Sequence, residues 1–152
     1  MRRLLDTNAW VALQRGDAAV VELVRDAEEI VMSMVVVGEL LFGFRHGTRY
    51  ARNSRQLDAF LSQPVVTLLP VDRGTAEWFG HISTWLRRAG TPIPTNDVWI
   101  AAHAFEAGAE LVSLDAHFDS VPGLLYRNPA ATNVYAYAPY GEYNYAVIGA
   151  GS

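Results

Sequence analysis

Acidic side chains from four separate segments carry the chemistry that this sequence could perform. They are Asp6 in LLDTN, Glu39 in VVVGELLFG, Asp97 in IPTNDVWIAA and Asp115 in LVSLDAHF. Most of them stand where a strand or helix is expected to begin or end. Magnesium and manganese ions prefer oxygen ligands of this kind. We interpret the four acids as a candidate site for Mg²⁺ or Mn²⁺, with Asp6 and Asp97 as direct ligands.

Clustered carboxylates need a cation, because their mutual repulsion raises some of their pKa values. A bound divalent ion relieves that repulsion and can activate water for in-line attack on phosphorus, while one or two ions offset charge on the departing oxygen. Such a reaction requires no nucleophilic side chain. The acids therefore indicate metal-dependent phosphodiester hydrolysis, with RNA as the leading substrate.

Each acid also has a purely structural interpretation. Asp6 and Asp97 could cap helices, Asp115 could close a turn, and Asp119 could lie on a solvated loop. Glu39 is hardest to explain in this way, because a buried carboxylate needs a partner and its neighbours are apolar. Those neighbours are Val35, Val36, Val37, Leu40, Leu41 and Phe42.

Composition limits the classes of protein that fit. The 152 residues are 51% hydrophobic, which suits one domain with its own core, and the lack of cysteine excludes disulfide, thiolate and iron–sulfur chemistry. The net charge of −4 argues only weakly against RNA, since bound cations and local arginines can attract phosphate. Candidate phosphate contacts are Arg15, Arg45, Arg87 and Arg88. No apolar run reaches membrane-spanning length, so we expect a soluble, cytoplasmic protein.

Short apolar runs alternate with helical patterns along the chain. Strands are expected at residues 3–5, 30–32, 65–69 and 110–114, with a possible last strand at 124–127. Helices are expected from Asp6 or Thr7, at 18–27, at 34–44, after a loop at 46–53, at 72–89 and at 97–107. Ser33 is the expected cap of the third helix, and Thr95 or Asn96 that of the last one. Gly90 and Gly108 are expected to end the last two helices. This alternation predicts a parallel sheet whose ligands gather beyond the carboxyl ends of the strands. Asp6 and Asp115 fall at those ends.

The composition changes after Arg127. Residues 128–152 are rich in alanine and tyrosine, with five tyrosines between Tyr135 and Tyr145. We interpret residues 1–127 as the folded domain and residues 128–152 as a low-complexity tail. The tail could add an edge strand to a neighbouring molecule or form a disordered extension.

Three segments resemble a known family over roughly residues 3–127. LLDTNAWVAL, GELLFG and PTNDVWIAAHAFEAGAELVSLDAHFDSVPGL are similar to PIN-domain ribonuclease toxins of the VapC type, the last block being the most specific. The resemblance implies a three-layer α/β/α fold around a short parallel sheet, and dependence on Mg²⁺ or Mn²⁺. It also implies cleavage of structured RNA such as tRNA or rRNA, inhibition by a VapB-type antitoxin, and a homodimer.

The resemblance extends to individual residues. The four acids match those of the family, while Ser113 stands where a small hydroxyl residue is common and Thr7 and Asn8 match its polar shell. Asp119 is a further supporting candidate. The Tyr-rich tail departs from the family pattern, and so does Leu114, which stands between Ser113 and Asp115 where a polar residue is common.

Other classes of protein remain possible from the residues alone. A histidine-based ribonuclease is disfavoured, because the four histidines form no short ligand motif, although His117 could touch substrate. A phosphatase with Asp6 as nucleophile would want a second aspartate where Asn8 stands, and a lysine. A PIN-like module could also bind RNA or protein without cutting. The presence of all four acids disfavours that module.

Overall fold

Five parallel strands form the central sheet in the order β3-β2-β1-β4-β5. The computed structural model describes residues 1–131, 134–137 and 143–146. The strands are β1 (Arg2–Leu5), β2 (Glu29–Ser33), β3 (Val66–Leu69), β4 (Glu110–Val112) and β5 (Tyr126–Arg127). The helices are α1 (Thr7–Gln14), α2 (Ala18–Arg25), α3 (Met34–His46), α4 (Tyr50–Leu61), α5 (Arg73–Ala89), α6 (Thr95–Ala107) and the 3₁₀ helix η1 (Ala116–Ser120).

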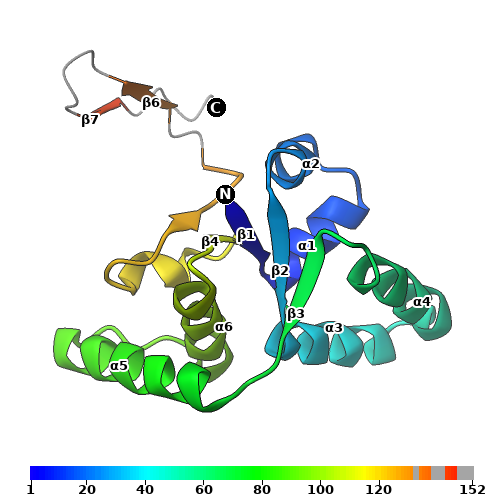
Figure 1. The fold of residues 1–152 in the computed structure, drawn as a ribbon, viewed down its shortest axis with the longest axis horizontal. Helices are drawn as coiled ribbons and strands as arrows, with labels where there is room; N and C mark the ends of the chain where they lie inside the picture. Colours follow the sequence, from blue (N-terminus) through cyan, green and yellow to red (C-terminus); the bar gives the residue numbers. More distant parts are fainter. Residues whose placement is uncertain (132–133, 138–142, 147–152) are drawn as a thin grey trace.

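Helices cover both faces of the sheet. Figure 1 shows α5 and α6 on one side and α1, α2 and α4 on the other. The chain moves outward from β1 to β3 and then returns past β1 to β4. Because crossovers between parallel strands are right-handed, this reversal of direction moves the connecting helices to the opposite face. The predicted three-layer α/β/α fold is confirmed.

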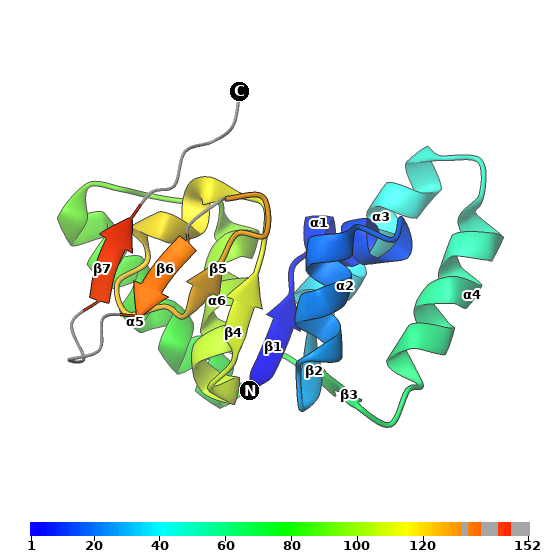
Figure 2. The same cartoon turned by 90° about the horizontal axis from the view of Figure 1, so that it is seen from above.

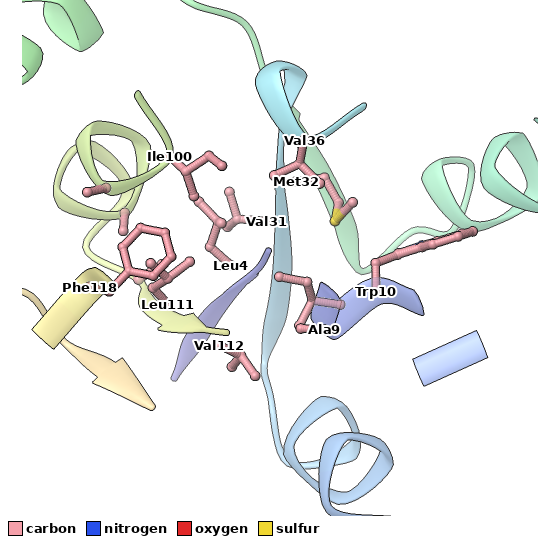
Figure 3. Close-up of a cluster of buried hydrophobic side chains, with 14 of the residues drawn as sticks. Leu4, Ala9, Trp10, Val31, Met32, Val36, Ile100, Leu111, Val112 and Phe118 are labelled. Carbon is pink, nitrogen blue, oxygen red and sulfur yellow. The ribbon is translucent and has the colours of Figure 1, made fainter. Parts of the chain in front are cut away.

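Alternation along the strands divides the core between the two faces. Leu4 pairs with both Val31 and Leu111, whereas Leu5 pairs with Val112. Figure 3 shows Leu4, Val31 and Leu111 beside Ile100 of α6 and Phe118 of η1, while Val112 lies on the side of Ala9 and Trp10 of α1. These side chains are almost fully buried. The short strands therefore hold their register because a shift of one residue would exchange the two faces.

Local signals place several helix ends correctly. Asp6 caps α1 by accepting a hydrogen bond from the Thr7 amide, and Ser33 caps α3 through the Val35 amide. Gly90 and Gly108 end α5 and α6 in the left-handed conformation, with φ of 69° and 60°. Glycine suits both positions because it has no Cβ to clash there.

Other predicted boundaries are wrong. Helix α4 begins at Tyr50, inside the segment expected to be a loop, and α3 continues to His46. Strand β4 ends at Val112 instead of reaching Leu114. Helix α6 starts at Thr95 after Pro94 and has no side-chain cap, so neither Thr95 nor Asn96 caps it. Asp97 consequently lies inside the first turn, where a negative charge suits the helix dipole.

The tail contains a second, separate pair of strands. β6 (Val134–Tyr137) and β7 (Tyr143–Ala146) pair antiparallel with each other, as Figure 2 shows. The predicted contacts of the remaining tail residues lie outside the described residues, and the domain boundary at residue 127 stays a prediction. Within the described part of the chain, no helix is long and apolar enough to span a bilayer.

A buried histidine joins α6 to the start of α3. His103 is fully buried, with Nδ1 2.7 Å from Ser33 Oγ and Nε2 3.1 Å from the Pro70 carbonyl oxygen. Because a carbonyl can only accept, Nε2 donates to Pro70, while Nδ1 pairs with the Ser33 hydroxyl. Ser33 thus serves both the helix cap and the histidine.

Replacing Ser33 should therefore destabilise the fold more than an ordinary cap mutation. Ser33→Ala leaves the buried His103 Nδ1 and the partly buried Val35 amide without partners, and we expect the free energy of unfolding to fall by about 2 to 3 kcal/mol in urea titrations. The exposed Ser62 of the α4 C-terminus provides a control, because Ser62→Ala should change it by less than about 0.5 kcal/mol. Equal effects of the two substitutions would contradict this account of the buried network.

Candidate functional site

Asp6 lies at the carboxyl end of the central strand and is 5% exposed. Its Oδ1 accepts the Thr7 amide at 2.8 Å, and its Oδ2 accepts the Ser113 hydroxyl at 2.6 Å. The end of β1 and the beginning of α1 fix the Asp6 backbone, so these bonds set the direction of the carboxylate. The same residue is thus both a helix cap and a member of the acidic group.

Ser113 and Asn8 connect the Asp6 region to the loop after β4. Ser113 Oγ also accepts the Asp115 amide at 3.0 Å, and Asn8 Oδ1 accepts the Leu114 amide at 2.9 Å. Leu114 uses only its backbone here, while its side chain is 40% exposed. A non-polar residue at position 114 is therefore compatible with the network, although the family pattern often has a polar one.

Asp97 and Asp115 meet around His117. The His117 Nδ1 atom is 3.0 Å from a carboxylate oxygen of each aspartate, and ligand atoms of all three residues lie within 4.8 Å of one another. Asp115 also accepts the His117 amide at 2.9 Å, so it closes the first turn of η1. From the sequence alone, His117 is expected only as a possible contact to substrate. Its position two residues after Asp115 was the available signal for its place in this group.

Glu39 reaches the same region from the middle of α3. It is half-buried, which corrects the expectation of a buried carboxylate, but it does have hydrogen-bonding partners. Its Oε1 accepts the Thr7 hydroxyl at 2.9 Å, and Asn96 Nδ2 lies 3.5 Å from Oε2. Thr7 therefore connects Glu39 to the helix that Asp6 caps.

The electrostatics of the site reflect crowded negative charge. Burial raises the pKa of Asp6 to about 6, against the lowering effect of its hydrogen bonds, and the charges of Asp97 and Glu39 add to the rise. Burial also raises the pKa of Asp97, with further contributions from Asp115 and Glu39. The hydrogen bond to Asp97 raises the pKa of His117. Positive charge is thus favoured at this point of the molecule.

Not every candidate residue lies in this group. The Asp119 side chain is exposed and forms no hydrogen bond or ion pair with residues 1–131. Its supporting role at the site therefore remains a prediction. Arg45 stacks over Tyr50 at 4.3 Å, and Arg87 and Arg88 lie in the last turn of α5. Arg15 lines a cavity that also includes Thr7 and Glu39.

The grouped side chains suit a hard divalent cation. Asp97, Asp115 and His117 offer two carboxylates and an imidazole at short range, and Asp6 and Glu39 add negative charge beside them. Oxygen-rich sites of this type favour magnesium or manganese, and an imidazole is compatible with manganese. Asp6 is not part of the closest group, so its predicted role as a direct ligand remains a prediction.

Comparison with known proteins gives the family. The PIN domain model matches residues 3–124. Ribonuclease VapC19 of Mycobacterium tuberculosis is 34% identical over 80% of this chain and 96% of its own length, and Ribonuclease VapC2 of Rickettsia felis is 29% identical over 82% and 96%. The crystal structure of VapBC2 from Rickettsia felis bound to a promoter DNA fragment contains a chain with a TM-score of 0.73 and 28% identity, covering 84% of this chain and 98% of that one. This chain therefore belongs to the PIN-domain family and, within it, to the VapC ribonucleases.

Proposed function

We propose that this protein is an endoribonuclease that hydrolyses RNA phosphodiester bonds with a divalent cation, Mg²⁺ or Mn²⁺, at the acidic group. The observation that carries the proposal is the convergence of Asp6, Glu39, Asp97 and Asp115 from four distant segments. This convergence is unfavourable for folding, because each acid raises the electrostatic cost of the others. It is therefore better explained by a function than by the fold. Membership of the VapC ribonucleases supports RNA as the substrate.

Each side chain has a distinct role in this proposal. Asp97, Asp115 and Asp6 hold the cation, and Ser113 and the Thr7 amide keep the Asp6 carboxylate in place. Glu39, held by Thr7, completes the negative surface from the side of α3. When bound, the cation supplies a Lewis acid that makes water a better nucleophile and offsets charge on the phosphate. His117 would exchange its contacts with the two aspartates for contacts with the cation or the substrate.

The protein acts, in this proposal, as the toxin of a toxin–antitoxin pair. The structurally similar chain from Rickettsia felis is part of a VapBC2 complex bound to promoter DNA. A VapB-type antitoxin is accordingly the expected protein partner. A homodimer, and tRNA or rRNA as the substrate, stay predictions from the family resemblance.

Cleavage of RNA should depend on Asp97. Asp97→Asn keeps the size of the side chain but removes its charge, so Mg²⁺-dependent cleavage of a tRNA pool should fall by about 100-fold or more. Asp58→Asn on the exposed face of α4 makes the same change in net charge and should leave cleavage unaltered. Equal cleavage by the two variants would defeat the proposed site. Absence of cleavage by the unchanged protein with either metal would favour a module that binds without cutting.

Removing the Asp6 charge should stabilise the metal-free protein. The folded state holds the Asp6 proton up to about pH 6, whereas the unfolded chain releases it near 3.8, so this carboxyl makes the fold less stable as pH rises between those values. In EDTA at pH 7 to 8, Asp6→Asn should therefore raise the free energy of unfolding by on the order of 1 to 3 kcal/mol. The gain should disappear below about pH 4.

The metal should reverse this order. Saturating Mg²⁺ stabilises the unchanged protein according to its affinity, and it should stabilise Asp6→Asn much less because one charged ligand is lost. Urea titrations with EDTA and with Mg²⁺ provide the comparison. An Asp6→Asn protein that is less stable than the unchanged one in EDTA at pH 8 would mean that the hydrogen bonds accepted by the Asp6 carboxylate outweigh the cost of burying its charge.

A further inference from the structure

A cavity of about 570 Å³ opens directly beside the acidic group. Thr7 and Glu39 belong to its wall, and the rest of the wall comes from α1, α3 and the first turns of α4. Figures 1 and 2 show α3 and α4 as neighbouring helices on the same side of the molecule as α1. A volume of this size is typical of sites that hold a small ligand or one unit of a longer one.

The cavity is positively charged, although the protein as a whole is acidic. Three arginines line it, Arg15, Arg49 and Arg52, and Glu39 is its single acid. Among residues 1–131, none of these arginines forms an ion pair, whereas Arg2, Arg3, Arg73 and Arg127 all do. All three are exposed, so their guanidinium groups are available to an anion. Unpaired arginines gathered in one cavity are suited to phosphate.

A second cavity of about 660 Å³ has a different charge pattern. Arg3 and Arg127 line the second cavity, but both are paired with the buried Glu110, at 2.9 and 3.2 Å. Its wall also carries Glu22, Asp26 and Asp119. Phosphate would meet excess negative charge in this second cavity. The cavity beside the acids is therefore distinguished by its charge and not by its size.

The wall of the positive cavity also carries neutral polar side chains and an aromatic ring. Trp10 belongs to the wall but is only 2% exposed. The amide side chains of Gln14, Asn53 and Gln56 add further hydrogen-bonding groups around the arginines.

We propose that this cavity binds the phosphodiester backbone of a single RNA strand and leads it to the acidic group. This inference rests on the proposed function and adds the place where the substrate is held. The acids repel phosphate when no cation is bound, so the attraction must come from nearby groups. Arg49 and Arg52 supply it from α4, Arg15 from the end of α1, and the shared residues Thr7 and Glu39 connect cavity and acids. Arg15 is among the candidate phosphate contacts expected from the sequence, whereas Arg49 and Arg52 are not.

The test measures RNA binding without cleavage. A short fluorescein-labelled single-stranded RNA of mixed sequence is titrated with protein in EDTA, and fluorescence anisotropy gives the Kd at several salt concentrations. For Arg49→Gln/Arg52→Gln we expect the Kd to rise about tenfold or more. Loss of two phosphate contacts should also reduce the slope of log K against log salt by about 1.4.

The control pair is Arg25→Gln/Arg73→Gln, which removes the same net charge from exposed positions. These positions lie near the amino ends of the strands, whereas the acidic group lies at their carboxyl ends. Its Kd and salt slope should stay close to those of the unchanged protein. Circular dichroism confirms that both pairs remain folded. Because EDTA removes the cation, this assay is independent of whether the acids catalyse hydrolysis.

Two outcomes would overturn the proposal. One is equal weakening by the two pairs, which would assign the effect to net charge. The other is unchanged RNA binding by Arg49→Gln/Arg52→Gln. If that variant also failed to bind its cognate antitoxin in a co-purification assay, the cavity would belong to the protein partner instead.

Discussion

Repulsion between carboxylates is the constraint around which this molecule is organised. Four acids approach one another at one edge of the sheet, and burial deepens the cost by removing water from Asp6. The fold tolerates the arrangement because a framework of hydrogen bonds holds the charged groups in place, from Ser113, Thr7, Asn96 and His117. Such an arrangement favours ligands with substantial positive charge, because positive charge relieves the repulsion.

The parallel sheet explains how such distant residues reach one place. Strands β1 and β4 are neighbours and run in the same direction, so Asp6 and Asp115 leave the sheet at the same edge. Helices α3 and α6 supply the other two acids, and the Ser33–His103 hydrogen bond joins these helices at 2.7 Å. In open sheets of this kind, ligands bind beyond the carboxyl ends of the strands, which is where these acids gather.

The sequence was informative where neighbouring residues decide the structure. Ser33, Gly90 and Gly108 were assigned correctly because capping depends on the residue type and the few residues around it. The acids were identified because charged residues stand out among apolar ones. The start of α4, the end of β4 and the uncapped start of α6 were missed, because residue type alone does not determine where an element begins or ends.

The same distinction applies to the site. Glu39 was expected to be buried, yet its neighbours along the helix face several directions and leave it half-exposed beside Thr7. The close approach of His117 to Asp97 joins α6 to η1 across 20 residues of chain, which no local pattern reveals. In the sequence, Arg49 and Arg52 cannot be distinguished from ordinary surface residues. Only the position of α4 beside α1 and α3 brings them into the same cavity wall as Arg15. The positions of Asp6 and Asp115 at the ends of strands could be predicted from the sequence. The side-chain contacts between different helices and strands could not.

The pairing of β1 with β4 also affects how the protein is made. Arg3 and Glu110, joined at 2.9 Å in adjacent strands, are separated by 107 positions in the chain. A chain still emerging from the ribosome has β1 available early, but its neighbour is synthesised only near the end of the domain. Asp115 comes later still. An unfinished polypeptide consequently lacks the assembled acidic group until translation of residues 3–124, which match the PIN domain, is nearly complete.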